Sequence, residues 1–199
     1  MRWFFDMDNP VMRSLSAAAD LLILNVLTLL CCLPIVTIGP ALTALADGCS
    51  RIVREEGGAV TKDFFRCFRA RFRRSVLPGL LLLLLAVLLV VDFRTAAVYA
   101  PFMRAGIAAL AVLLLALSIY FFALLAREGE GLKETLKKAA MLAVGYAPRT
   151  VGILLVWIVL WTLALIFIRH AAPVLLMFGL SLPGFVSAML LRPVFPPRS

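Results

Sequence analysis

The sequence predicts an all-α, polytopic helical membrane protein, and three observations support that prediction. Hydrophobic residues make up 63% of the 199 positions and charged residues only 16%, so water is a poor solvent for most of the surface. Long apolar runs alternate with short segments that hold nearly all of the arginine and lysine. The runs lack the strand alternation of a barrel, and a backbone in lipid must then satisfy its own hydrogen bonds as a helix.

Five apolar stretches are candidates for transmembrane helices, because about 20 residues of helix cross the ~30 Å hydrocarbon core of a bilayer. None of the five contains Asp, Glu, Lys or Arg. Little polar sequence remains between them, so we expect residues 1–199 to form a single integral membrane domain. The stretches are Leu21 to Ala46, Val76 to Val91, Ala105 to Ala126, Val151 to Ile168 and Ala171 to Leu191.

The first stretch is too long for one crossing, and its sequence interrupts a helix. Pro34, Gly39 and Pro40 lie within six residues of one another, and such residues stop one helix and allow another to begin in a new direction. We therefore expect Ala41 to Val53 to form a short second leg, which either re-enters the membrane without crossing or crosses it as the return leg of a hairpin. Asp47 lies in that leg and suits lipid poorly, so the leg would need protein around it.

The basic residues predict the topology. Counted along the chain, Lys and Arg number 2 before the first stretch, then 8, 2, 5 and 1 in successive connections, and 2 in the C-terminal tail. The positive-inside tendency places the groups of 8, 5 and 2 in the cytoplasm, and with them the C-terminus. If the short leg crosses, the N-terminus is also inside and the counts are 17 inside against 3 outside; otherwise they are 15 against 5. Both arrangements fit, and the hairpin is slightly favoured.

The most basic connection, Thr61 to Arg74, has the pattern of an interfacial amphipathic helix. At about 100° per residue its phenylalanines fall within one arc, and four of its cations cluster on an adjacent arc. Such a helix can dock a cytoplasmic partner or an acidic groove, or it can lie on anionic lipid headgroups, which requires nothing further. Nucleic-acid binding is disfavoured, since topology alone places charge beside spans. The candidate contact residues are Lys62, Phe64, Phe65, Arg66, Phe68, Arg69, Phe72 and Arg73.

The sequence offers little material for catalysis. His170 is the one histidine, the four cysteines contain no C-x-x-C pair, and no nucleotide-binding or nucleophile motif is present. Asp20, Asp47 and Asp92 lie at or near the ends of apolar stretches, which disfavours an intramembrane proton or ion relay. We therefore expect a non-enzymatic protein with no catalytic residues, no cofactor and no metal site.

Several segments in the first 75 residues resemble the signature of the YesL-like family of small bacterial integral membrane proteins. The most specific is the string Leu-Pro-Ile-Val-Thr-Ile-Gly-Pro-Ala, and beyond these segments the likeness rests on the order of spans. The resemblance marks Pro34, Thr37, Gly39, Pro40, Asp20 and Asn25 as candidate structural residues. The segments are Asn9-Pro10, Asp20 with Leu21 to Asn25, Leu33 to Ala41, Thr43 to Leu45, and Lys62 to Arg66 with Phe68 and Phe72.

The resemblance implies the bacterial plasma membrane as location and a link to carbohydrate utilisation. Two hypotheses follow. In the preferred one, the chain is an accessory or stabilising partner of a carbohydrate ABC-type uptake system, and the phenylalanine-rich basic helix contacts permease subunits. In the alternative, it is a small oligomeric transporter or channel in its own right, with the broken helix around Thr37 and Gly39 lining the path. No nucleic acid is expected as a partner.

Overall fold

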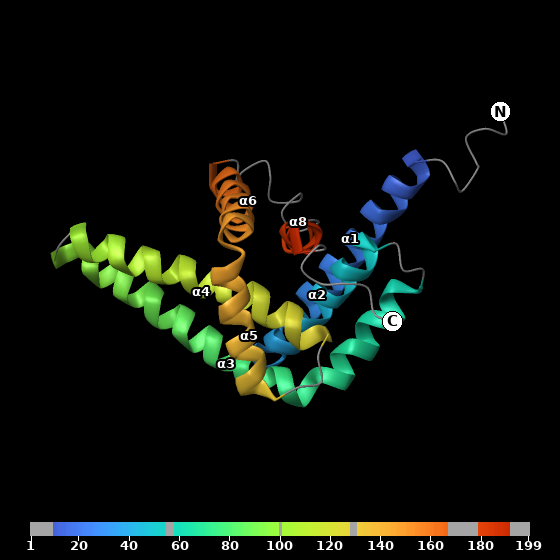
Figure 1. The fold of residues 1–199 in the computed structure, drawn as a ribbon, viewed down its shortest axis with the longest axis horizontal. Helices are drawn as coiled ribbons and strands as arrows, with labels where there is room; N and C mark the ends of the chain where they lie inside the picture. Colours follow the sequence, from blue (N-terminus) through green and yellow to red (C-terminus); the bar gives the residue numbers. More distant parts are fainter. Residues whose placement is uncertain (1–9, 55–57, 100, 128–130, 167–178, 192–199) are drawn as a thin grey trace.

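A computed structural model describes residues 10–54, 58–99, 101–127, 131–166 and 179–191, and within these ranges the regular structure is helical throughout, with no strand. This confirms the predicted all-α class. Figure 1 shows the helices in chain order: α1 (Pro10–Cys32), the 3-10 helix η2 (Ile35–Thr37), α2 (Ile38–Val53), α3 (Val60–Tyr99), α4 (Pro101–Arg127), α5 (Leu132–Gly145), α6 (Ala147–Ile166) and α8 (Ser181–Leu191).

Several described helices are long and apolar enough to cross a membrane, which indicates a membrane protein. Three pass that test alone, over Ser14–Cys32, Val60–Thr95 and Met103–Arg127. A fourth is added if α5 and α6, which meet at a bend of 93°, form one broken span. Helix α8 has 11 residues and rises about 16 Å at 1.5 Å per residue, about half of a bilayer core. Three or four candidate spans are therefore shown, and the predicted five are not confirmed.

The predicted break after the first span is a tight reversal of the chain. Helix α2 begins at Ile38, slightly before the predicted Ala41, and runs back along α1, so that Gly48 faces Leu24 across the hairpin. The single hydroxyl proton of Thr37 is shared between the carbonyl oxygens of Cys31 and Pro34, and the Pro34 carbonyl also accepts from the backbone N–H of Thr37. The second leg thus folds back along α1, and its crossing of the bilayer stays a prediction.

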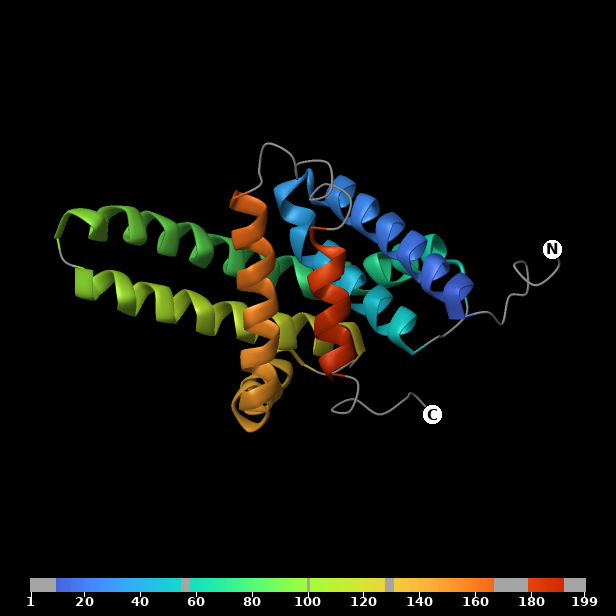
Figure 2. The same cartoon turned by 90° about the horizontal axis from the view of Figure 1, so that it is seen from above.

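Helix α2 occupies the centre of the molecule. It packs against α1, α3, α4 and α8, and Figure 2 shows it between α1 and the crossed helices. The protein enclosure expected for Asp47 is present, because that side chain is only 6% exposed. The buried residues of α2 are Gly39, Pro40, Ala41, Thr43, Ala44, Leu45, Asp47, Gly48 and Cys49.

Helix α3 joins two segments that the sequence treats separately, the basic amphipathic segment and the second apolar stretch. Pro78 lies inside it, and proline in a helix interior removes one hydrogen bond and bends the axis. Figure 1 shows the resulting change of direction, after which α3 runs beside α4 as a projecting pair. Large apolar side chains on this pair, such as Leu81 and Leu113, are more than 60% exposed, as expected of helices that face lipid or other helices.

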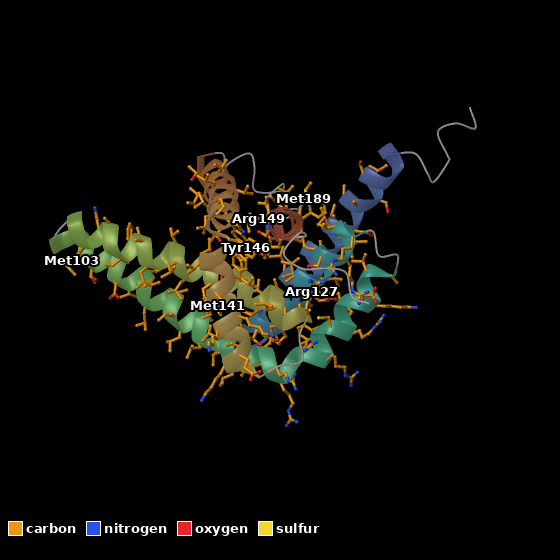
Figure 3. All side chains as sticks on the ribbon, viewed as in Figure 1. Met103, Arg127, Met141, Tyr146, Arg149 and Met189 are labelled. Atoms are coloured by element: carbon orange, nitrogen blue, oxygen red, sulfur yellow. The ribbon has the colours of Figure 1, made fainter. Side chains whose placement is uncertain are left out.

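The corner between α5 and α6 is held by polar contacts. The Tyr120 hydroxyl of α4 shares a hydrogen bond of 2.9 Å with Thr150 Oγ1, and that threonine also donates to the Ala143 carbonyl. The guanidinium of Arg149 lies over the ring of Tyr146, 5.2 Å from its centroid, and Figure 3 shows the two residues at this corner. Figure 2 shows that α6 and α8, which pack together, run crosswise to the α3–α4 pair.

Candidate functional site

Helices α2 and α3 cross at a contact that only glycine permits. A Cβ added to Gly39 would lie 2.0 Å from the carbonyl oxygen of Ser75, and one added to Gly79 would lie 2.4 Å from the Gly39 Cα. One helical turn away, Thr43 Oγ1 donates to Ser75 Oγ at 3.0 Å, and both side chains are buried. Small residues and interhelical hydroxyl bonds of this kind favour close helix packing in membranes. The crossing fixes where the basic half of α3 starts relative to α2.

A charge network with two buried carboxylates joins the end of α2 to the beginning of α3. Arg51 Nε donates to Asp47 Oδ2 at 2.9 Å, and Arg51 Nη1 donates to Asp63 Oδ2 at 3.2 Å. Arg66 forms an ion pair with the other oxygen of Asp63. Asp47 and Asp63 are only 6% and 9% exposed, and carboxylates so buried need paired cations. The network therefore ties the two helices together.

Sequence reasoning missed Asp63 and Arg51 as positioning residues, although a signal was present. Asp47 precedes Arg51 by four positions and Asp63 precedes Arg66 by three, which are the helical spacings for ion pairs. Asp63 also lies in the first turn of α3, where a negative charge interacts favourably with the helix dipole. The bridge between the two pairs depends on tertiary structure.

The predicted phenylalanine arc divides between the interior and the surface. Phe64 is 1% exposed and belongs to the core cluster that includes Leu21 and Leu45, whereas its neighbour Phe65 is 48% exposed. Phe68 stacks on Phe64 with centroids 6.2 Å apart, and Phe72 meets Phe68 edge-on at 5.6 Å. Phe68 and Phe72 are half-buried. The apolar arc of the amphipathic segment thus packs mainly against α1 and α2 of the same chain.

Next to the buried part of this arc lies an exposed basic face. Its members recur at helical spacing along the first half of α3, and in Figure 3 long nitrogen-tipped side chains project from the lower edge of the molecule there. The structure therefore brings together five of the eight predicted contact residues and leaves Phe64, Phe68 and Phe72 behind them. We call the basic face the exposed set Lys62, Phe65, Arg66, Arg69 and Arg73.

Asn25, a predicted structural residue, caps a helix far away in the sequence. Its side chain is fully buried, and Oδ1 accepts hydrogen bonds from the backbone N–H groups of Leu180 and Ser181 at 3.0 and 3.2 Å. These donors precede or begin α8 and would otherwise lack partners in the interior. Among the other predicted structural residues, Gly39 and Pro40 are buried at the crossing, Thr37 and Asp20 are half-buried, and Pro34 is exposed.

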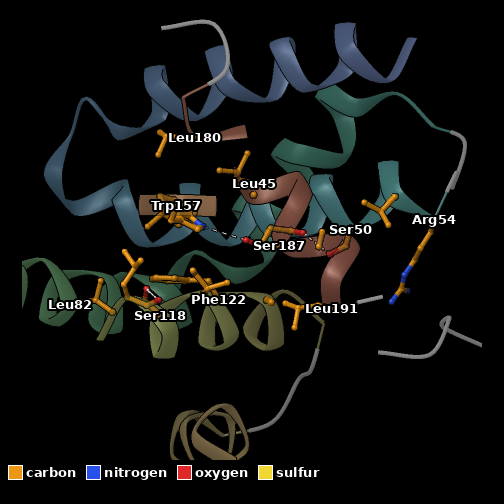
Figure 4. Close-up of a pocket in the computed structure, with 18 residues that line it drawn as sticks. Leu45, Ser50, Arg54, Leu82, Ser118, Phe122, Trp157, Leu180, Ser187 and Leu191 are labelled. Carbon is orange, nitrogen blue, oxygen red and sulfur yellow. Dashed lines mark hydrogen bonds between the residues drawn. The ribbon is translucent and has the colours of Figure 1, made fainter. Parts of the chain in front are cut away.

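A cavity of about 290 Å³ lies between α2, α3, α4, α6 and α8, and sequence reasoning did not predict it. Figure 4 shows Arg54 at one end and Leu82 near the other. The hydroxyls of Ser50, Ser118 and Ser187 line it, and each already donates to a carbonyl of its own helix. The remaining lining is almost entirely apolar.

Comparison with known proteins adds one match. A family model described as "Protein of unknown function, DUF624" matches residues 21–93. The matched part contains the α1–α2 hairpin, the glycine crossing, the charge network and the basic face. No curated protein and no solved structure matches the chain. The match supports kinship with a family of unknown function over these residues, and the closer likeness to the YesL-like family stays a prediction.

Proposed function

We propose that this chain is a non-enzymatic integral membrane protein that acts as an accessory or stabilising partner of a carbohydrate ABC-type uptake system. The observation that supports this role is the basic face of α3, which is exposed on one side and firmly packed on the other. The carbohydrate and permease part of the proposal comes from the YesL-like resemblance. The docking part comes from the geometry described above.

The basic face is well suited to protein recognition because it is held in place before any partner arrives. Phe64 anchors it to the core, and Asp63 binds both Arg51 and Arg66. A surface ordered in advance loses less conformational entropy on binding. Phe65 stands exposed among arginines, and aromatic and arginine side chains are enriched at the energetic centres of interfaces.

The alternative occupant of this face is the layer of anionic lipid headgroups. A helix that lies on a bilayer normally inserts its apolar side, yet here that side packs against α1 and α2. The cations would still be attracted to anionic headgroups, by about 1 kcal/mol for each residue near the surface. We therefore favour an acidic protein surface, with headgroups as the competing ligand.

We place the protein in the bacterial plasma membrane with its C-terminus in the cytoplasm, and we propose five spans. The connection after the first apolar stretch holds eight cations and the connection that contains α5 holds five. The positive-inside tendency would place both connections on the cytoplasmic side. The fifth span would require α8 together with the residues that precede it.

The second candidate function is a small oligomeric transporter or channel. Its supporting observation is the interrupted helix at η2, because discontinuous helices build substrate sites in many transporters. Thr37, however, already binds backbone carbonyls at this break. The break is thus accounted for as a structural turn, and we rank this function second.

The test is affinity purification from native membranes in mild detergent, with mass spectrometry of the proteins retained. The variant Phe65→Ala with Arg69→Ala removes an aromatic side chain and a cation from the basic face. Its matched control, Phe93→Ala with Lys137→Ala, removes an exposed aromatic side chain and a cation elsewhere. We expect permease subunits with the wild type and the control, and their loss with the first variant.

Two results would contradict the proposal. Equal retention of permease subunits by both double variants would show that the basic face is not the contact. Recovery of this chain alone as a defined oligomer would favour the transporter, and flux measurements in liposomes would then follow. Size-exclusion profiles of both variants in detergent check that each keeps its fold.

A further inference from the structure

The cavity between α2, α4, α6 and α8 has the character of a site for a hydrocarbon chain. Its lining includes Leu42, Leu115, Ile119, Phe122 and Leu191, and its volume of about 290 Å³ is near the lower end of the range for small-molecule sites. An apolar chain gains free energy by leaving water for such a lining. The cavity is nevertheless open enough at its surface to be reached from outside.

The interior of the cavity suits an apolar chain better than a sugar or another strongly hydrated ligand. Ser50 donates to Ala46, Ser118 to Leu115 and Ser187 to Pro183, so the hydroxyl protons are already committed. The indole N–H of Trp157 is also engaged, since it donates to Ser187 Oγ at 3.3 Å. Away from Arg54, a sugar hydroxyl that entered would leave water without finding an uncommitted donor in the lining, and burying it so would be unfavourable.

Charge is present at one end only. Arg54 is the single charged side chain among the described residues that line the cavity, and it lies at the C-terminal end of α2. Figure 4 shows it at the rim, away from Trp157 and Leu82. A ligand that matches both parts has an apolar chain for the interior and an anionic group near the guanidinium, whose five N–H donors can bind more than one acceptor at a time.

We propose that this cavity binds one acyl chain of an anionic phospholipid, with the net-negative phosphate group of the lipid at Arg54. The lipid would fill the space between the crossed helices and stabilise the position of α8 against α2. The site is separate from the basic face and does not depend on the proposed docking function. Its loss would weaken lipid binding and leave partner retention unchanged.

Trp157 supplies the measurement because it lines the cavity, and bromine on an acyl chain quenches indole fluorescence on contact. Trp3→Phe and Trp161→Phe leave Trp157 as the one tryptophan of the chain. The full-length protein in detergent is titrated with phosphatidylglycerol that carries brominated acyl chains, and with brominated phosphatidylcholine. We expect saturable quenching by the anionic lipid in this background.

Filling the cavity tests the location of the chain. Ala123→Phe places a ring in the lining, and Ala188→Phe does so from α8 in case the first variant folds poorly. Ala108→Phe is the matched control, because it makes the same change on an exposed part of α4 outside the cavity. We expect both filled variants to lose the saturable quenching and the control to keep it.

Arg54→Gln tests the anionic end. We expect about tenfold weaker binding of phosphatidylglycerol, the usual effect of losing one charge-assisted hydrogen bond, and a clearly smaller effect on phosphatidylcholine, because its choline cation offsets the phosphate charge. Equal weakening for both lipids would overturn the role of Arg54. The acyl-chain site itself is overturned by quenching that survives in the filled variants, or by a wild-type background that shows no saturable quenching because residues of the chain itself fill the space.

Discussion

The glycine crossing of α2 and α3 makes a sharp prediction about a single methyl group. Gly79→Ala adds a Cβ that would lie 2.4 Å from the Cα of Gly39 and 2.7 Å from its nitrogen. Both are backbone atoms, so no flexible side chain can move aside. The two helices must separate, or one of them must bend further.

The size of the effect follows from the distances. Ordinary contact with a Cβ begins at 3.4 Å, so the helices must move apart by roughly 1 Å. The hydrogen bond between Thr43 and Ser75, now 3.0 Å long, would then exceed 3.5 Å and be lost. Overpacking typically costs about 1–3 kcal/mol and the bond about 1 kcal/mol, while alanine regains about 1 kcal/mol of helix propensity. We expect a net loss of about 1–3 kcal/mol in the free energy of unfolding.

The assay is equilibrium unfolding of the purified protein in mixed micelles, monitored by circular dichroism. Gly106→Ala is the matched control, because a Cβ at that position on α4 meets nothing within 4 Å. It should be neutral or slightly stabilising. Equal stability of Gly79→Ala and Gly106→Ala would show that α2 and α3 do not cross at this contact, and the reasoning would fail.

Three further predictions use other contacts. Asn25→Ala should destabilise the protein by about 2–4 kcal/mol in the same unfolding assay, because two buried N–H groups lose their acceptor; an unchanged midpoint would contradict this. Asp63→Ala should lower stability by about 1–3 kcal/mol, since Arg51 loses one of its two carboxylates but stays partly exposed, and Lys137→Ala serves as the surface control. In the folded protein, N-ethylmaleimide should alkylate the half-buried Cys31 much faster than the fully buried Cys49, as measured by peptide mass spectrometry; equal rates would contradict the burial of α2.

The α1–α2 hairpin illustrates how far local signals reach. Pro34, Gly39 and Pro40 predict a break, and the structure has one, because proline and glycine act on the backbone wherever they occur. Asp47 predicts that the second leg needs protein around it, and α2 is enclosed. The number of spans is not determined by local signals alone. Helix α6 passes the length test for a span only together with α5, and the described part of the last apolar stretch is the short helix α8.

The basic segment shows the limit of helical periodicity as a predictor. The periodicity correctly groups the phenylalanines on one arc, yet it does not indicate which part of that arc a neighbouring helix covers. Phe64 and Phe65 are adjacent in sequence and about 100° apart on the helix, and α1 and α2 bury the first while leaving the second exposed. The cavity was likewise unpredictable, since its lining comes from five helices that are distant in sequence.

The sequence by itself determined the helical membrane class, the interruption near Pro34 and the basic amphipathic segment. These depend on composition and on residues within one or two turns, where hydropathy, charge and backbone preference act directly. Only the tertiary structure decided that Gly39 meets Gly79, that Asn25 caps α8, and that Asp63 shares Arg51 with Asp47. Each of these contacts joins residues of two different helices, so its free energy exists only once the helices have packed.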